Sequence, residues 1–484
     1  MSWEPVIGIE VHVELATQSK MFCGCAVGFG ADPNTNVCPV CLGLPGALPV
    51  PNRQAMEWIM AIGLALNCQV ADRSVFHRKN YFYADLPKNY QISQFDIPVC
   101  HDGYLDITVD GEIRRVGIER AHMEEDTGKS THVGEGGRIH SATETLLDFN
   151  RSGVPLVEIV SKPDIRSAAE AREYAVELRT LVAELGVSDA RLEEGSIRFD
   201  ANVSVRPTGA NELGTKVEIK NMNSFRSLER AIDFEITRQI EALEGGTELV
   251  QETRHWDEES GVTHPMRTKE GSSDYRYFTE PDLVPMVMDD DWVDEVRSRL
   301  PELPAARRAR YLESGLDVDL AGVLSDSPKE LRQVYEDAVT GGASPRAAAN
   351  WLTGEIIAWL RRTDTDLSEV PLTGTQLAEL VSIVDDGTVS SSAAKEVLEG
   401  VLDGEGDPRA VAETRDLVQI SDTSALEAAV DEALAANPDA VDNFQAGETK
   451  VVGFLVGQVM RATQGKADPQ IVNEMLREKL GSLS

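Results

Sequence analysis

The chain has 484 residues, of which 42% are hydrophobic, enough for about two to four domains with cores of their own. Its 82 Asp and Glu residues outnumber 46 Lys and Arg, and this formal net charge of −36 excludes a surface that attracts nucleic acid everywhere. No apolar run approaches the roughly 20 residues of a membrane span. Residues 1–5 lack the basic start of a signal peptide, so we expect a soluble cytoplasmic protein.

The first predicted element is a strand over residues 6–15. Every second residue there is apolar, and Glu10 and His12 fall on the other face. This period of two is typical of a half-buried strand. The two polar side chains would be neighbours able to hold a cation. An ordinary edge strand also has one solvent-exposed polar face, and this segment alone does not distinguish the two interpretations.

Four cysteines follow in two closely spaced pairs, Cys23 with Cys25 and Cys38 with Cys41. Paired thiolates at these spacings suit a closed, tetrahedral Zn²⁺ site, which predicts a structural zinc. A redox role for the second pair is the weaker interpretation, because it leaves the first pair without a function. The two remaining cysteines are isolated, and we expect them to be core thiols.

Residues 79–94 are rich in tyrosine, lysine and amide side chains. Tyrosines can stack on nucleic-acid bases and lysines can reach phosphates, so this segment is a candidate substrate-binding region. Aromatic packing beneath a loop explains the same composition equally well. The candidate residues are Lys79, Tyr81, Tyr83, Lys88 and Tyr90.

Acidic residues then recur in β-type runs. Three consecutive carboxylates end the segment 122–126, where like charges raise each other's pKa unless water or a cation surrounds them. Glu158 lies within an apolar run, where an unpaired charge is costly. Together with the first strand, these segments predict one buried, oxygen-rich metal site. The spacing does not choose between Glu124 and Glu125.

The order of elements predicts an α+β domain, rich in antiparallel strands, followed by helices alone. Residues 104–120 resemble a hairpin that turns at Asp110-Gly111. Past residue 293 the strand patterns stop, and an acidic, glycine-containing segment at 403–408 separates a last group of helices. We therefore predict an α+β domain at 1–293, an all-α helical domain at 294–404 and a small all-α tail domain at 405–484. Helices are expected at 53–66, 167–185, 226–244, 304–314, 328–340, 344–361, 373–385, 391–402, 407–417 and 451–464.

Long motifs along the chain carry a family resemblance. They are IGIEVHVEL (7–15), CPVCLGLPGALP (38–49), RKNYFYADLPKNYQISQ (78–94), HMEEDTGK (122–129), DFNRSGVPLVEIVSKPD (148–164), KNMNSF (220–225), QETRHW (251–256), DYRYFTEPDL (274–283) and GFLVGQVMRATQGKADPQ (453–470). With these motifs the chain resembles, over nearly its whole length, the B subunit of the tRNA-dependent amidotransferase family.

The resemblance implies a ligase that forms carbon–nitrogen bonds with glutamine or asparagine as nitrogen donor. In that family the B subunit uses ATP and Mg²⁺ to phosphorylate the side-chain carboxylate of misacylated Glu-tRNA(Gln) or Asp-tRNA(Asn), and ammonia then displaces the phosphate. The ammonia comes through a channel from an amidase (A) subunit, and a small C subunit holds A to B in a heterotrimer. The resemblance also implies a cradle domain, a helical domain and a tRNA-binding tail.

The resemblance also assigns site residues. It places the Mg²⁺ ligands and the catalytic centre at Glu10, His12, Glu125 and Glu158, and so selects Glu125 where spacing alone could not. Because some members lack all four cysteines, a zinc ion here is expected to be structural.

Two alternatives remain at this point. A non-catalytic, tRNA-binding scaffold subunit of the same complex is disfavoured by carboxylates embedded in β-type runs. A self-sufficient amidotransferase would need its own glutaminase site. The run Ser390-Ser391-Ser392 before Lys395 lacks the glycines of an amidase loop and is predicted to start a helix. We therefore expect the ammonia to come from another chain.

Overall fold

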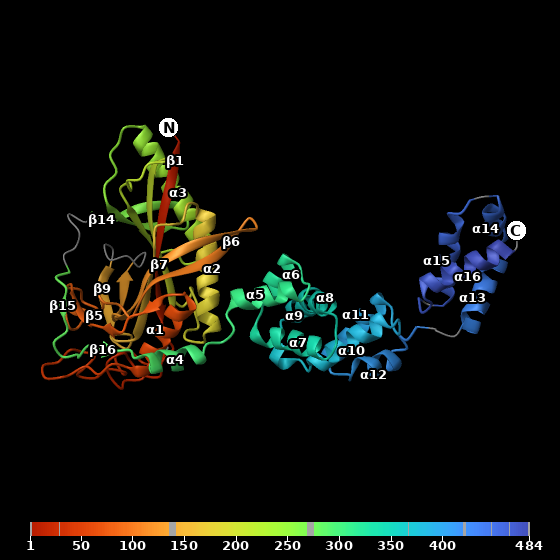
Figure 1. Cartoon of the computed structure of the whole chain (residues 1–484), viewed down its shortest axis with the longest axis horizontal. Coiled ribbons are helices and arrows are strands. Elements are labelled where there is room, and N and C mark those ends of the chain that lie inside the picture. The colour runs from red at the N-terminus through yellow and green to blue at the C-terminus, as the bar shows by residue number, and fades with distance from the viewer. Residues whose placement is uncertain are drawn as a thin grey trace. The chain divides into compact units, whose positions relative to one another are not determined.

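The strand β1 (Trp3–Glu14) runs through the middle of a nine-stranded sheet in the computed structural model (Figure 1). The side chains of Ile9, Val11 and Val13 are fully buried, as their alternation predicts. Neighbours in the sheet follow the order β14-β13-β12-β11-β1-β10-β7-β6-β2. All pairs are antiparallel except β12 with β13, so the predicted α+β class is confirmed.

The other strands of this sheet come from distant parts of the first 268 residues. Two of them form the predicted hairpin, whose turn at Asp110 and Gly111 has positive φ at both positions (51° and 78°), as a two-residue turn requires. The strands are β2 (Gln69–Val70), β6 (Cys100–Val109), β7 (Glu112–Glu125), β10 (Pro155–Ser161), β11 (Ile197–Pro207), β12 (Val217–Lys220), β13 (Glu252–Asp257) and β14 (Val262–Thr268).

Three helices supply the rest of the first core. They are α1 (Arg53–Ala65), α2 (Ala168–Glu184) and α3 (Phe225–Glu244), close to the predicted bounds. Each begins at a polar residue whose side chain accepts a backbone N–H of the first turn: Asn52, Ser167 and Ser224. Their apolar residues share one cluster with the buried residues of β1, β7 and β10, so the opposite, polar residues of these strands are left for other contacts.

Short strands build smaller sheets beside the large one. The three-stranded sheet β15-β4-β5 combines β4 (His77–Asn80), β5 (Tyr90–Ser93) and β15 (Phe278–Thr279). Contacts of β5 with β7 bring the tyrosine-rich segment against the run of carboxylates. Two further pairs are β3 (Arg73–Ser74) with β16 (Met286–Val287), and β8 (Lys129–Gly134) with β9 (Ala142–Asp148).

The chain divides into two units, Met1–Leu303 and Pro304–Ser484. The helix α4 (Asp290–Ser298) packs on α1, and Trp292 Nε1 donates to Glu57 Oε1 at 3.1 Å. The first core therefore continues past the composition change at residue 293. The structure describes residues 2–28, 30–134, 142–268, 275–365, 367–419, 423–446, 448–463 and 465–482, and in these stretches no helix is long and apolar enough to cross a membrane.

The named elements of the second unit are all helices, and its described residues form two separate hydrophobic clusters. The first cluster ends with Val411 and Ala412 of α12, although the predicted tail begins at 405; the second begins at Leu426. The sequence analysis predicted no separate helix at α4, α6, α13, α14 or α16. The elements are α5 (Pro304–Glu313), α6 (Val318–Ser325), α7 (Lys329–Thr340), α8 (Pro345–Asn350), η1 (Trp351–Ile356), α9 (Ile357–Thr363), η2 (Leu367–Glu369), α10 (Gly374–Asp385), α11 (Ser391–Leu402), α12 (Pro408–Thr414), α13 (Thr423–Ala436), α14 (Pro438–Gln445), α15 (Val451–Ala462) and α16 (Pro469–Ser482).

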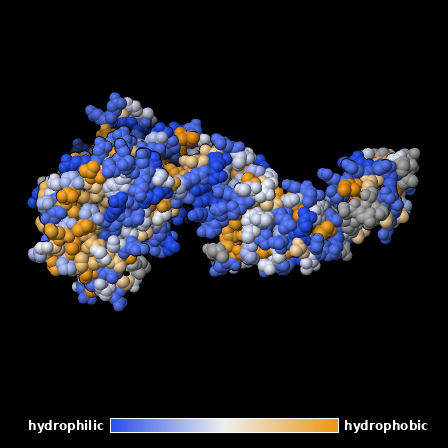
Figure 2. Space-filling model, turned by 60° about the horizontal axis from the view of Figure 1, so that its bottom comes forward, coloured by the Kyte–Doolittle hydropathy of each residue, from blue (hydrophilic) through white to orange (hydrophobic). Residues whose placement is uncertain are grey.

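The surface agrees with the acidic composition. Figure 2 shows hydrophilic residues over much of the visible face, with apolar residues gathered in patches on the first unit. Ion pairs such as Arg362–Glu399 and Arg415–Glu405 cross between neighbouring elements of the helical unit. Exposed pairs of this kind contribute little stability each, so the buried clusters hold the helices together.

Candidate functional site

A polar row crosses the central strands of the large sheet. His12 of β1 lies opposite Glu158 of β10, and Glu158 lies opposite His122 of β7. Residues directly opposite one another in neighbouring strands share a face. Glu124 is two positions beyond His122 and therefore projects from the same face. The register thus gathers two histidines and two carboxylates from three strands.

The side chains in this row approach one another closely. His12 Nε2 lies 3.7 Å from Glu158 Oε2 and 3.9 Å from Glu124 Oε2. One ligand atom from each of these three residues lies within 4.8 Å of the others. Two carboxylates and an imidazole around one point form a donor set that suits a divalent cation such as Mg²⁺ or Mn²⁺. The residues present therefore fit the expected metal.

His122 lies at the rim of this set, with Nε2 3.4 Å from Glu158 Oε2 and 3.8 Å from Glu124 Oε1. Its other ring nitrogen is buried and has no hydrogen-bond partner among the described residues. Burial works to lower the pKa of His122, but the charges and hydrogen bonds of Glu158 and Glu124 together outweigh burial and raise that pKa. The sequence analysis did not select His122, although it begins the run of residues that includes the carboxylates.

The two carboxylates stay ionised despite their burial. Burial works to raise the pKa of Glu158, but the charges and hydrogen bonds of His122 and His12 hold it well below its usual range. Burial and the charge of Glu158 also work to raise the pKa of Glu124, but the Lys79 ammonium and His122 together lower it to about 2. Both carboxylates are therefore ionised near neutral pH.

Glu10 lies on the same strand face as His12, two positions before it. Asn202 Nδ2 donates to Glu10 Oε1 at 2.8 Å. Burial and the charge of Glu158 raise the pKa of Glu10, and the Asn202 hydrogen bond offsets part of that rise. Glu10 thus borders the cluster, outside the set of three whose ligand atoms meet.

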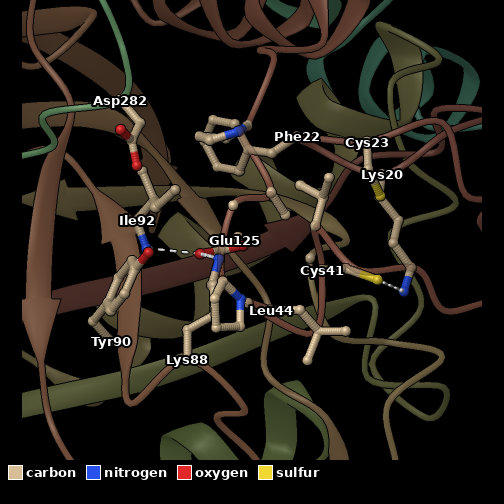
Figure 3. Close-up of a pocket in the computed structure, with 17 residues that line it drawn as sticks. Lys20, Phe22, Cys23, Cys41, Leu44, Lys88, Tyr90, Ile92, Glu125 and Asp282 are labelled. Atoms are coloured by element: carbon tan, nitrogen blue, oxygen red, sulfur yellow. Dashed lines mark hydrogen bonds and ion pairs between the residues drawn. The ribbon is translucent and has the colours of Figure 1, made fainter.

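Glu125 lies on the opposite face of β7 from Glu124, because successive residues of a strand point to opposite sides. Its Oε1 accepts the Ile92 N–H at 2.8 Å and pairs with the Lys88 ammonium. Figure 3 shows Glu125 between Lys88 and Ile92. The resemblance assigned Glu125 to the cation, whereas the geometry brings Glu124 beside His12 and separates Glu125 from it.

Two cavities adjoin the two faces. The cavity at Glu125, about 190 Å³, is lined also by Lys88, Tyr90 and two of the cysteines (Figure 3). The cavity at the cluster, about 540 Å³, is lined by Glu10, His12, His122 and Glu158 among others. Only the larger one combines the cluster with several cationic and aromatic side chains, namely Lys79, Arg120, Lys216, Lys220, Phe95, Tyr275 and Tyr277.

Three of the five predicted substrate-binding residues line these two cavities. Lys79 lines the larger one, whereas Lys88 and Tyr90 line the smaller. The remaining two line neither cavity. The Tyr81 hydroxyl donates to Gln91 Oε1 at 3.4 Å, and the Tyr83 side chain is largely exposed.

The sequence analysis did not identify Lys216, Glu218 and Lys220, which line the larger cavity. Lys220 contacts Asp200 and lies 3.0 Å from Glu218, while Lys216 is exposed at the approach to β12. The polar–aromatic run at 275–277 was visible in the sequence, but its place beside β4 was not. The Phe95 and Tyr277 rings stack, with centroids 4.5 Å apart and planes 15° apart.

The four predicted cysteines come together. One sulfur from each lies within 4.8 Å of the other three, and the Cys38 N–H donates to Cys41 Sγ at 3.1 Å. The Lys20 side chain is fully buried, with Nζ 3.7 Å from Cys41 Sγ and 3.2 Å from the Phe149 carbonyl. Four sulfurs around one point, with a buried ammonium against them, fit a metal–thiolate centre. The other two cysteines, Cys68 and Cys100, are buried, as expected.

Comparisons with known proteins place this geometry in a family. Residues 5–294 match the GatB/GatE catalytic domain, and residues 333–480 match the GatB domain. The B subunit of the aspartyl/glutamyl-tRNA(Asn/Gln) amidotransferase from Carboxydothermus hydrogenoformans is 51% identical over 482 residues, covering 99% of each chain. The chain belongs to this family. The corresponding protein from Moorella thermoacetica is 52% identical over 99% of this chain and 100% of its own length.

In this amidotransferase chain, a second ionic cluster adjoins the first at the ends of β1 and β7. Arg198 Nη2 lies 3.0 Å from Asp126 Oδ2 and 3.9 Å from Glu14 Oε1. Arg151 donates to the Thr127 carbonyl at 3.0 Å and so fixes the turn that follows the carboxylates. Burial and the adjacent Asp126 raise the pKa of Glu14 to about 8.

The raised pKa of Glu14 predicts a pH dependence of stability. Between pH about 4.5 and 8 the unfolded state has ionised Glu14 while the folded state keeps its proton, so this contribution to stability is lost as pH rises. Glu14→Gln should lessen the fall in the free energy of unfolding between pH 5 and 8, by up to a few kcal/mol. Urea unfolding at several pH values measures this free energy. If it falls equally with pH in the variant and in the natural protein, the pKa of Glu14 is not raised.

Proposed function

We propose that this chain phosphorylates the side-chain carboxylate of misacylated Glu-tRNA(Gln), Asp-tRNA(Asn) or both, using ATP and Mg²⁺, and that ammonia then displaces the phosphate. Its relatives are named as the corresponding amidotransferase subunits, and the catalytic-domain match covers the whole sheet. The observation that carries the proposal is the cluster of His12, Glu124 and Glu158, of which His12 and Glu158 line a cavity of about 540 Å³. A non-catalytic scaffold has no need for carboxylates buried at such a cost.

The cation set in this proposal follows the geometry. His12, Glu124 and Glu158 would hold the metal, and Glu10 would stand beside it, so Glu124 takes the place that the resemblance gave to Glu125. When bound, the metal would neutralise charge between two anionic reactants, whose repulsion otherwise dominates phosphoryl transfer.

The cationic side chains of the larger cavity would receive the triphosphate. Lys216 is exposed at the mouth, Arg120 borders the cavity on β7, and Lys220 is held in place by Asp200. The volume lies in the range of about 300–1,000 Å³ typical of sites for ligands of this size. The stacked Phe95 and Tyr277 rings provide an aromatic surface for a base.

The ammonia would come from a partner amidase (A) subunit, joined to this chain by a small C subunit in a cytoplasmic heterotrimer. The candidate serines of this chain have other roles: the Ser390 hydroxyl accepts the Ala393 N–H at 3.2 Å and caps α11. Lys395 pairs with Glu355 on the helical surface. This serine run is therefore no amidase-type site, which supports glutamine hydrolysis in another chain.

The tail helices α13–α16 would bind the tRNA body. They have a hydrophobic cluster of their own, which includes Leu455 and Leu480, so they can act as a separate binding module. Removing residues 423–484 should raise the KM for charged tRNA and leave ATP affinity unchanged. Equal tRNA affinity of the truncated and intact complexes at one salt concentration would exclude this role.

Two neighbouring carboxylates provide the sharpest test of the cation site. Glu124→Gln should weaken Mn²⁺ binding at least about ten-fold, because it removes a charged ligand, and should slow phosphorylation by orders of magnitude. Glu125→Gln removes the same charge from the opposite face and should keep Mn²⁺ affinity. Titration followed by electron paramagnetic resonance measures both. The reverse pattern, with Mn²⁺ lost only in Glu125→Gln, would reinstate Glu125 as the ligand.

The four cysteines would hold a structural zinc ion. Cys38→Ser should lose zinc and lower the thermal midpoint, because the loop at residues 22–42 loses its cross-link, while turnover per folded complex falls less. Elemental analysis with thermal unfolding checks this. Zinc-free protein after anaerobic purification, with intact cysteines, would contradict the proposal.

A further inference from the structure

Lys79 shares Glu124 with the cation cluster. Lys79 lies on β4, and its Nζ is 3.1 Å from Glu124 Oε1. The same oxygen accepts the Ser93 hydroxyl at 2.9 Å, and the other oxygen accepts Gln91 Nε2 at 3.2 Å. The Lys79 side chain keeps one-fifth of its surface exposed, and it borders the larger cavity.

A cation and Lys79 therefore compete for one carboxylate. The second oxygen of Glu124 lies 3.9 Å from His12, within the three-residue set. A divalent cation there would lie within a few ångströms of the Lys79 ammonium, and like charges at this range in a buried site repel strongly. Binding of the cation must then weaken the Lys79–Glu124 ion pair, and by reciprocity the ion pair weakens cation binding.

We propose that Lys79 is an exchangeable counter-ion: a divalent cation displaces its ammonium from Glu124, and the freed ammonium then binds a phosphate or carboxylate oxygen in the larger cavity. This inference rests on the proposed function. The flexible four-carbon stem lets the ammonium move while its backbone stays in β4. The Tyr275 ring, whose centroid is 5.4 Å from Nζ, lies on the cavity side of Lys79 and offers the cation a surface along the way.

The exchange gives the site an order of loading. Until the metal binds, Lys79 neutralises Glu124, and the cavity has one fewer cation available for an anionic reactant. Once a metal is bound, the freed Lys79 ammonium would add one positive charge to the cavity that receives the anion. Metal and anion therefore bind with positive cooperativity, which Lys79 transmits.

Lys88 provides a matched control. It pairs with Glu125, the next residue of the same strand, but faces the smaller cavity. Lys79→Gln and Lys88→Gln therefore remove the same charge from neighbouring carboxylates on opposite faces of β7. Lys79→Arg keeps the charge and tests rescue.

The experiment is Mn²⁺ titration of the full-length protein by electron paramagnetic resonance, with circular dichroism to check folding. Lys79→Gln should bind Mn²⁺ roughly ten-fold more tightly than the natural protein, and Lys88→Gln within about two-fold of it. Lys79→Arg should restore weaker Mn²⁺ binding. With saturating Mn²⁺, Lys79→Gln should bind a non-hydrolysable ATP analogue several-fold more weakly, and added Mn²⁺ should enhance its nucleotide affinity less.

The outcomes separate this inference from the proposed function. Unchanged or weaker Mn²⁺ binding by Lys79→Gln, beside normal binding by the natural protein, overturns the exchange alone. If the natural protein binds no Mn²⁺, or if Glu158→Gln leaves Mn²⁺ binding unchanged, the proposed cation site itself fails. If Lys79→Gln does not fold, Lys79→Met gives the same readout, and an affinity no tighter than that of the natural protein overturns the exchange.

Discussion

Repulsion among carboxylates on one face of a buried sheet is the interaction on which the site depends. Glu158 and Glu124 are almost completely buried, and Glu10 is half-buried beside them. Charges in such a position must be paired or coordinated. His12, His122 and Lys79 supply part of that pairing, and the ligand atoms of His12, Glu124 and Glu158 lie close enough together to hold a cation. The groups that compensate the buried carboxylates therefore determine both the stability and the chemistry of this sheet face.

The pleat of the strands separates this chemistry from the core. In β1, Ile9 and Val11 enter the hydrophobic cluster while Glu10 and His12 point away from it. The same alternation gives Glu124 and Glu125 different neighbours, different lysines and different cavities. The segment from Lys79 to Ser93 contacts both residues, so a movement there would be felt on both faces.

Much of this arrangement could be predicted from the sequence. The alternation around His12 identifies a strand with a polar face, and the cysteine spacing identifies a four-sulfur cluster, because both signals are local. The choice between Glu124 and Glu125 could not be made from spacing, since it depends on the register of β7 against β10. Lys216 and Lys220 reach the cavity only through the pairing of β12 with β11, which no local pattern contains.

The domain limits show the same difference between local sequence signals and tertiary packing. Composition changes at residue 293, but α4 spans this position and packs on α1, so the first core extends further. Likewise α12 joins the cluster of the helices before it, although the glycine-containing segment precedes it. Composition records where strands end, whereas a domain ends where buried contacts end.

The most direct test of the account is the fate of a labelled oxygen. The assembled amidotransferase would receive Glu-tRNA(Gln) whose side-chain carboxylate carries ¹⁸O, together with ATP and glutamine, and mass spectrometry would follow the inorganic phosphate. If the carboxylate is phosphorylated and ammonia displaces the phosphate, each turnover transfers one ¹⁸O atom from the carboxylate to phosphate. Amide formation with unlabelled phosphate would contradict the account, because no acyl phosphate would have formed.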